Sequence, residues 1–146
     1  MALWQSRSSK VDLLKKVPLF DGLSRRQLEQ IATLADEVDV PAGKRLAQSG
    51  ESGHELFIIL EGRAMVKTPH GRTVRMGPGD FFGEMSLLDG GPRSADVDAE
   101  GAMRLFVIGH REFWSLLSTA PPIARKIMTA LSARLREANA AFSVCT

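Results

Sequence analysis

The sequence predicts an α+β fold in which an antiparallel β-roll, a jelly-roll-like double-stranded β-sandwich, is flanked by N-terminal helices and a long C-terminal helix. Two observations carry this prediction. Between Val38 and Ile108, short apolar runs are separated by PAG, SGESG, EGR, HGR and GPGD, which is typical of short strands joined by tight turns. On either side of this region, apolar residues recur at helical spacing instead.

The N-terminal region predicts two short helical elements that serve packing. VDLLKKVPLF, residues 11–20, reads as an apolar helical turn or two that Pro18 closes. Ser24 is a suitable N-cap for a following helix, because its hydroxyl can accept a hydrogen bond from a free backbone N–H group. Leu28, Ile31 and Leu34 are expected to form the buried face of that helix.

The central region predicts two hairpins and a closing strand. ELFIIL and RAMVKT lie on either side of Gly62, and RAMVKT and RTVRM lie on either side of residues 69–71, so both pairs are interpreted as hairpins. AMRLFVI is the expected last strand of the sheets. HREFWSLL then predicts a short amphipathic helix.

The longest predicted helix runs from Pro121 to about Phe142 and carries two apolar stripes. One stripe has coiled-coil spacing, and the other adjoins it, which favours one contact with the chain's own β-roll and another with a second subunit. The alternative is that both stripes pack on the same chain. The charged residues of this helix are interpreted as a solvated face. The first stripe is Ala124, Met128, Leu131, Leu135, Ala138 and Phe142; the second is Ile123, Ile127 and Ala130; the charges are Arg125, Lys126, Arg134, Arg136 and Glu137.

The segment FFGEMSLLDGGPRSADV, residues 81–97, predicts an anion site. GEMSLLDGG reads as one short helix, and the free N–H groups of Glu84, Met85 and Ser86 at its start favour a negative charge. Arg93, after a Pro turn, can bring a planar fork of donors that suits a phosphate, and Ser94 adds a hydroxyl. A carboxylate only accepts hydrogen bonds, so Glu84 beside a phosphate would choose a hydroxyl donor such as a ribose 2′-OH. The alternative is that Glu84 and Arg93 are two solvated surface charges.

This segment closely resembles the phosphate-binding cassette of cyclic nucleotide-binding domains, the family of the catabolite activator protein and of the regulatory subunits of cAMP-dependent protein kinase. VPLFDGLSRRQLEQIA, PAGKRLAQSGESGHELFIILEGRAMV and GPGDFFGE fall in the family's order, so the resemblance covers roughly residues 11–142. It implies that Glu84 takes the ribose 2′-OH and that Arg93 holds the exocyclic oxygens of the cyclic phosphate. It further implies that the amides of Gly83, Met85, Ser86 and Ser94 complete the cradle.

The resemblance leaves the nucleotide base less well defined. Ala138 and Asn139 fall where the catabolite activator protein has two hydroxyl residues that contact adenine. The amide of Asn139 offers a donor and an acceptor to a base edge, the alternative being an exposed polar residue. Ser94 follows the arginine as in the cAMP-binding bacterial activator, so cAMP is expected ahead of cGMP. Asp96 adds a negative charge near the expected phosphate, and either faces solvent by strand alternation or weakens affinity.

Length predicts a single domain, and the lack of a recognisable signal or membrane-spanning segment favours the cytoplasm. The chain has 146 residues and a formal charge of +2, which predicts one folded unit at 11–142 with terminal tails at 1–10 and 143–146, and no polyanionic partner. Neither a signal peptide nor a membrane-spanning run is recognisable in it. The single cysteine, Cys145, allows no internal disulfide, which fits a reducing compartment.

The sequence therefore predicts a stand-alone sensor or regulatory module that is not an enzyme. Its C-terminal helix is expected to serve as a lid and as a homodimer contact, acting on an unknown effector protein. Because no winged helix follows, direct DNA binding is not expected. Alternatives are a structural dimerisation module with a degenerate site, or the sensor fragment of a longer regulator. A cupin-type metal oxygenase is disfavoured, because His54, His70 and His110 lack the spacing of a metal triad, so we expect no metal and no catalytic residue.

Overall fold

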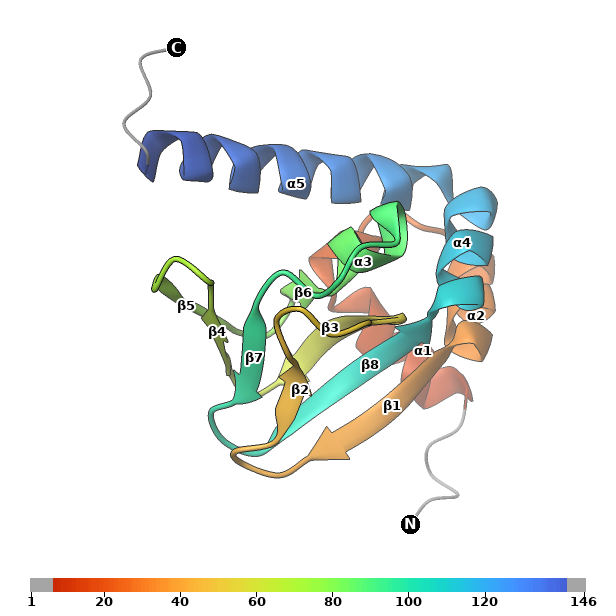
Figure 1. Ribbon diagram of the computed structural model, residues 1–146. Coiled ribbons are helices and arrows are strands. Elements are labelled where there is room, and N and C mark those ends of the chain that lie inside the picture. Colours follow the sequence, from red (N-terminus) through yellow and green to blue (C-terminus); the bar gives the residue numbers. More distant parts are fainter. Residues whose placement is uncertain (1–6, 142–146) are drawn as a thin grey trace.

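The computed structural model describes residues 7–141, with side chains placed for residues 10–136 (Figure 1). It confirms the α+β prediction: two antiparallel four-stranded sheets form a β-roll with helices at one end and a long helix across one side. The helices are α1 (Arg7–Lys15), η2 (Pro18–Phe20), α2 (Arg25–Leu34), α3 (Glu84–Asp89), α4 (His110–Thr119) and α5 (Pro121–Ala141).

The strands divide into two sheets. The first has the order β1 (Ala35–Val40), β8 (Met103–Gly109), β3 (Glu55–Glu61) and β6 (Phe81–Phe82). The second has the order β2 (Arg45–Ala47), β7 (Asp96–Ala99), β4 (Ala64–Lys67) and β5 (Thr73–Met76). The link from β6 to β7, which contains α3 and Arg93, thus leads from one sheet to the other.

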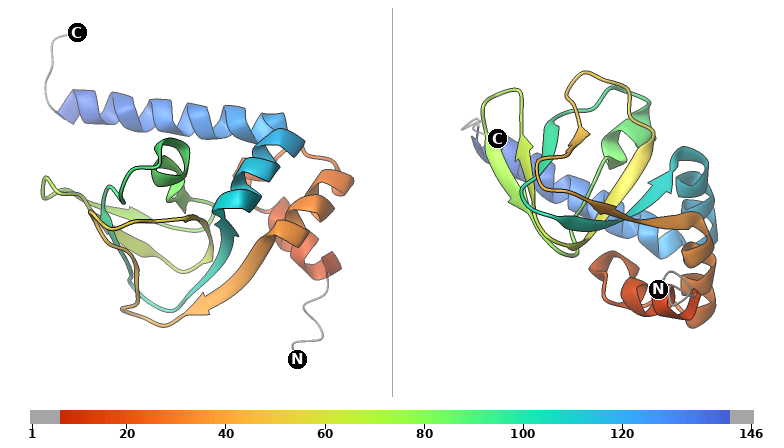
Figure 2. Two further views of the ribbon diagram at one scale, coloured as in Figure 1. Left: turned by 45° about the vertical axis from the view of Figure 1, so that its right-hand side comes forward. Right: turned by 90° about the horizontal axis from the view of Figure 1, so that it is seen from below.

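Strand β3 explains how the core is built. Its run LFII is apolar throughout because both faces of the strand are covered. Leu56 and Ile58 pack with the helices, whereas Phe57 and Ile59 pack between the two sheets. The first sheet is therefore the central layer, with α1, α2 and α4 on one side and the second sheet on the other (Figure 2).

The hairpin predicted around Gly62 is wrong. Strands β3 and β4 belong to different sheets, and β3 pairs with β6 and β8. Gly62 turns the chain between the sheets with φ +89°, and a Cβ there would lie 2.5 Å from the carbonyl oxygen of Ala102. The second predicted hairpin, between β4 and β5, is confirmed, with Ala64 opposite Met76 and Lys67 opposite Thr73.

The N-terminal predictions hold in their main features. Ser24 caps α2 through a capping box: its hydroxyl accepts from the N–H of Gln27, whose side chain accepts from the N–H of Ser24. Leu28 and Ile31 are buried as expected, whereas Leu34 is only partly buried. The first strand begins at Ala35, directly after α2, and so earlier than the Val38 start expected from the sequence.

Helix α5 starts at the predicted proline and lies along the side of the roll that carries α3 (Figures 1 and 2). Ile123 and Ile127 are buried in the helical core, and Lys126 donates to the carbonyl oxygens of Pro18 and Asp21 at 3.1 and 2.6 Å. Met128 and Leu135 remain 62% and 63% exposed, so the alternative that both stripes pack on the same chain is wrong for them. Within residues 7–141, no helix is long and apolar enough to cross a bilayer.

Candidate functional site

The candidate site starts at Gly83, which begins α3. Gly83 has φ +97°, a backbone conformation that favours glycine. A Cβ at this position would lie 2.5 Å from the carbonyl oxygen of Glu55 and 2.7 Å from Nη1 of Arg93, so a side chain would also collide with its surroundings. The tight turn thus brings the beginning of α3 to the Arg93 side chain, which contacts Gly83.

The side chain of Arg93 is buried, with 6% of its surface exposed. Its guanidinium donates from Nη1 to the carbonyl oxygen of Gly83 at 3.2 Å and from Nη2 to that of Glu55 at 3.0 Å. It also lies over the ring of Phe57, 5.6 Å from the centroid. Burial lowers the pKa of the guanidinium, and the charges of Glu55 and Glu84 oppose this shift. The solvated-charge alternative is therefore wrong for Arg93.

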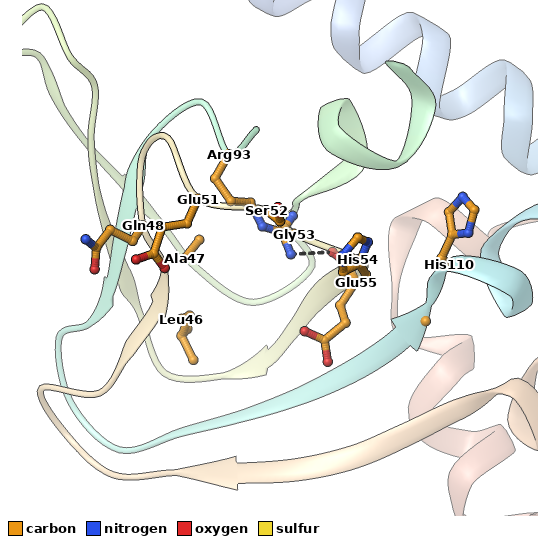
Figure 3. A pocket seen from close by; sticks show the side chains of 11 residues that line it. Leu46, Ala47, Gln48, Glu51, Ser52, Gly53, His54, Glu55, Arg93 and His110 are labelled. Carbon is orange, nitrogen blue, oxygen red and sulfur yellow. Dashed lines mark hydrogen bonds between the residues drawn. The ribbon is translucent and has the colours of Figure 1, made fainter. Parts of the chain in front are cut away.

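The loop before β3 makes room for this arginine. A Cβ on Gly53 would lie 1.8 Å from Nε of Arg93, so the loop requires a residue without a side chain at this position. Figure 3 shows Arg93 reaching toward Gly53, His54 and Glu55. A cleft with a volume of about 490 Å³ lies beside these residues. The cleft is lined by Leu46, Ala47, Gln48, Glu51, Ser52, Gly53, His54, Glu55, Arg93, Gly109 and His110. Sequence reasoning missed Gly53, for which only the general turn pattern SGESG gave a signal.

Glu84 is also buried, with 1% of its surface exposed, and its partner comes from α5. Arg134 donates from Nη1 to Oε1 of Glu84 and from Nη2 to the carbonyl oxygen of Phe81, the second bond measuring 2.8 Å. The same guanidinium lies over the Phe81 ring at 5.1 Å. Burial raises the pKa of Glu84, and the charges of Arg134 and, more weakly, of Arg93 counteract the rise.

Arg134 corrects the sequence interpretation of α5, because it was expected on a solvated face. Its side chain is 36% exposed and forms a salt bridge with a buried carboxylate. The sequence did hold a signal for this position: Arg134 extends the buried stripe of Ile123, Ile127 and Ala130 by four residues, which places it on the same side of the helix. Lys126 is likewise held against η2, whereas Arg125 and Arg136 are exposed as expected.

The remaining predicted residues divide into three groups. Met85 and Ser94 are exposed neighbours, and the Ser94 hydroxyl donates to Sδ of Met85 at 3.9 Å. Ser86 is buried, with its carbonyl oxygen accepting from the N–H of Gly90 at the end of α3. Asn139 lies in the last turns of α5, where side chains are outside the described residues. The structure thus brings together Gly83 to Ser86, Arg93 and Ser94.

Asp96 is turned toward β2 and away from the interior. Its carboxylate accepts from the N–H of Ser49 at 2.8 Å and lies 3.8 Å from Arg45, which also binds Asp98. Val97, between the two aspartates, is buried, so the predicted alternation of β7 is confirmed. The negative charge of Asp96 is thereby engaged by Arg45 and by a backbone amide.

The chemistry of this arrangement is that of binding. Arg93 is a fixed cation with several N–H donors, and Glu84, nine residues earlier in the chain, is an acceptor. Together they suit a ligand that carries both an anion and a hydroxyl group. Within the described residues, no three histidine, cysteine, aspartate or glutamate side chains are grouped so that they could hold a metal ion.

Comparison with known proteins agrees with this geometry. The family model described as "Cyclic nucleotide-binding domain" matches residues 37–120. A cyclic nucleotide-gated potassium channel of Rhizobium etli is 42% identical over 84% of this chain and 34% of the channel. The cyclic AMP receptor protein of Thermus thermophilus is 32% identical over 86% of this chain and 61% of the receptor.

A solved structure gives the same result. The crystal structure of the catabolite activator protein of Thermus thermophilus superposes with a TM-score of 0.77 at 30% identity, covering 86% of this chain and 62% of the other. The chain thus spans about a third of the length of the matched channel and about three fifths of the length of the matched receptor.

Proposed function

The chain belongs to the cyclic nucleotide-binding domain family, whose model matches more than half of its residues, and from this premise we propose that it binds cAMP in preference to cGMP as a sensor or regulatory module. Domains of this family bind ligands and regulate; they do not catalyse. The unit that binds is residues 11–142, and we assign it no catalytic residue. This unit works in the cytoplasm, in keeping with the lone cysteine of the sequence.

The observation that carries the proposal is the pair of buried, opposite charges, Glu84 and Arg93, at the beginning of α3. Arg93 already places N–H groups at the start of α3, and a cyclic phosphate bound there would take donors from it and from the amides of Gly83, Met85, Ser86 and Ser94. Glu84 would accept the ribose 2′-OH. A buried arginine and a buried glutamate are costly to keep in a fold, which favours a functional reason for both.

The preference for cAMP rests on residues around the base. Ser94 follows Arg93 as in the cAMP-binding bacterial activators, and a relative named cyclic AMP receptor protein covers most of this chain. Asn139, near the end of α5, would offer its amide to the base edge. We place the base beneath α5, which acts as the lid of the site and is anchored at Ile123, Ile127 and Lys126.

The output of the module is contact with other protein surfaces. The exposed Met128 and Leu135 on α5 support a homodimer through this helix, and the nucleotide would alter that contact or one with an effector protein. Neither a membrane nor DNA is a proposed partner of residues 11–142. A structural dimerisation module with a degenerate nucleotide site remains the second candidate, favoured by the same two exposed side chains.

Calorimetric titration tests the proposal. Protein that has been unfolded, freed of nucleotide and refolded should bind both cyclic nucleotides saturably and cAMP more tightly. Arg93→Ala should weaken binding at least about a hundredfold, because a hydrogen-bonded cation to the phosphate is lost, whereas Arg63→Ala at an exposed position should bind like the wild type. If the refolded wild type bound neither nucleotide, the dimerisation module would become the better account.

A further inference from the structure

We propose that Phe57 is a positioning residue for the phosphate-binding arginine: its ring supports the face of the Arg93 guanidinium, while backbone carbonyl oxygens hold the edge. The phosphate affinity of Arg93 would then depend on the electron density of a core phenylalanine as well as on hydrogen bonds. This inference rests on the proposed function, because it takes Arg93 as the group that binds the cyclic phosphate.

The contacts of the Arg93 guanidinium come from β3 and from the end of β6. Phe57 on β3 lies opposite Phe82 on β6, and the two rings stack with their centroids 4.8 Å apart and an angle of 17° between the ring planes. On β3, Glu55 precedes Phe57 by two residues, and Gly83 directly follows Phe82. The carbonyl oxygens of Glu55 and Gly83 accept from Arg93. The aromatic pair and the two carbonyl groups therefore hold Arg93 together.

The ring of Phe57 contacts a part of Arg93 that hydrogen bonds do not reach. Hydrogen bonds engage the edge of a guanidinium, because its N–H groups lie in the plane of the group. An aromatic ring within about 6 Å attracts a cation through the negative charge on the face of the ring. The central carbon of the Arg93 guanidinium lies over the Phe57 ring, 5.6 Å from the centroid. Phe57 thus adds a contact to the face that complements the two hydrogen bonds at the edge.

Burial strengthens this contact and fixes the ring that makes it. Arg93 and Phe57 expose only 6% and 7% of their surfaces, so little water screens the attraction between them. Phe57 belongs to the apolar cluster between the two sheets, with Phe82, Ile59 and Leu105 among its members. A ring held in a packed core gives the cation a fixed position. A cation that is in place before the ligand arrives loses less freedom on binding, which raises affinity.

An aromatic support also leaves Arg93 free to bind a phosphate. A carboxylate in the same place would neutralise the cation and occupy its edge, whereas a phenyl ring carries no net charge and occupies the face. A guanidinium has five N–H donors, and the carbonyl oxygens take one each from Nη1 and Nη2. Phe57 therefore positions Arg93 without using the donors or the charge that a phosphate requires.

The test varies the electron density of the ring while its shape stays nearly constant. Phe57 is replaced by phenylalanines with an increasing number of ring fluorine atoms, which withdraw electron density from the face, and cAMP affinity is measured by calorimetric titration. The affinity should fall with each added fluorine, by about tenfold for the trifluorinated ring, because the attraction to Arg93 weakens. The same replacements at Phe106, a buried phenylalanine of β8 on the helical side of the core, should leave the affinity unchanged.

A second pair of variants removes the ring. Phe57→Leu should weaken cAMP binding by about tenfold or more, whereas Phe106→Leu should bind like the wild type. Both substitutions leave a cavity and should lower the free energy of unfolding, so stability alone cannot separate them. An affinity that stayed constant through the Phe57 series would overturn the inference and make Phe57 a packing residue. An affinity that rose would also overturn it, because the ring would then compete with the phosphate for Arg93.

A measurement without nucleotide keeps the inference separate from the proposed function. In nitrogen-15-labelled, nucleotide-free protein, the relaxation of Nε of Arg93 should report a rigid side chain in the wild type and in Phe106→Leu, and a mobile one in Phe57→Leu. An equally rigid Arg93 in Phe57→Leu would reject Phe57 as its support even if cAMP bound well. Increased mobility in a protein whose wild type bound no cyclic nucleotide would reject the cyclic nucleotide function and leave the positioning of Arg93 by Phe57 in place.

Discussion

The guanidinium of Arg93 donates to the carbonyl oxygens of Gly83 and Glu55 and occupies space that a side chain on Gly53 would fill. The loop before β3 therefore positions Arg93 together with the beginning of α3. The two hydrogen bonds keep the guanidinium at the start of α3, where the amides of Glu84 and Met85 also lie. A phosphate that binds there meets donors that are already in position, and this preorganisation lowers the cost of binding. Changes in the loop should therefore reach the site through Arg93.

We expect Gly53→Ala to weaken cAMP binding by about tenfold or more, because the added Cβ must displace the guanidinium of Arg93 from its bonded position. Isothermal titration measures the loss, and circular dichroism verifies that the fold persists. Gly101→Ala is the matched control, because no atom lies within 4 Å of a Cβ there. Equal affinity in both variants would show that Arg93 binds from another position.

Because of Glu84, we expect the free energy of unfolding and the nucleotide affinity to change with pH in opposite directions. Its pKa is raised, mainly by burial, so between the ordinary carboxyl pKa and the raised value the folded state holds more protons than the unfolded state. The contribution of Glu84 to the free energy of unfolding should thus fall as pH rises through this window. Nucleotide affinity should rise over the same window, because the ionised carboxylate is the better acceptor.

Urea unfolding of the wild type and of Glu84→Gln at several pH values measures the first effect. Glutamine does not titrate, so the difference in unfolding free energy between the two proteins should shift against the wild type as pH increases. A difference that is constant from about pH 4 to pH 8 would mean that Glu84 has an ordinary pKa.

For single residues, the sequence predicted the polar side chains of the site better than it predicted the side chains that contact them. Glu84, Arg93 and Ser94 stand in one short segment with a recognisable pattern, and the structure brings them together. Arg134 was missed because a charged residue on a helix is usually solvated, and its partner lies 50 positions earlier in the chain. Only the spacing from Ile127 and Ala130 pointed to its inward direction.

Helices and strands that depend on neighbouring residues were predicted, whereas strand pairings between distant segments were not. The cap at Ser24, the β4–β5 hairpin and the start of α5 follow from local turn and capping chemistry, and they were predicted. The pairing of β3 with β8 joins segments about 50 residues apart along the chain, and no local rule specifies it. The Gly62 turn was therefore interpreted as a hairpin although it leads from one sheet to the other.

Helix α5 has one side on the protein and one side free in the described chain, which leads to a prediction about assembly. If Met128 and Leu135 form a subunit contact, the double variant Met128→Glu, Leu135→Glu should shift a dimer to monomer, since four buried carboxylates would face each other. Sedimentation equilibrium measures the change. Val74→Glu, at an exposed apolar residue of β5, is the control and should leave the mass unchanged. A wild type that is monomeric at high concentration would exclude this contact.

In the molecule as a whole, the candidate site lies where three parts of the fold meet: the first sheet, the second sheet and α5. The segment from β6 to β7 leaves the first sheet, forms α3, brings in Arg93 and enters the second sheet. Helix α5, packed at its start on the N-terminal helices, crosses this segment through Arg134 (Figure 1). A ligand between α3 and the roll would thus act on both sheets and on α5 together, as the proposed sensor function requires.

The measurement that tests the central claim most directly is a titration of nitrogen-15-labelled, nucleotide-free protein with cAMP, followed by amide NMR. The claim is that the cyclic phosphate is held at the start of α3 and by Arg93. The account predicts that the largest shifts occur at the amides of Gly83, Met85, Ser86 and Ser94 and at Nε of Arg93, and that they saturate together. Saturable shifts confined to other parts of the chain, or no shifts at all, would contradict it.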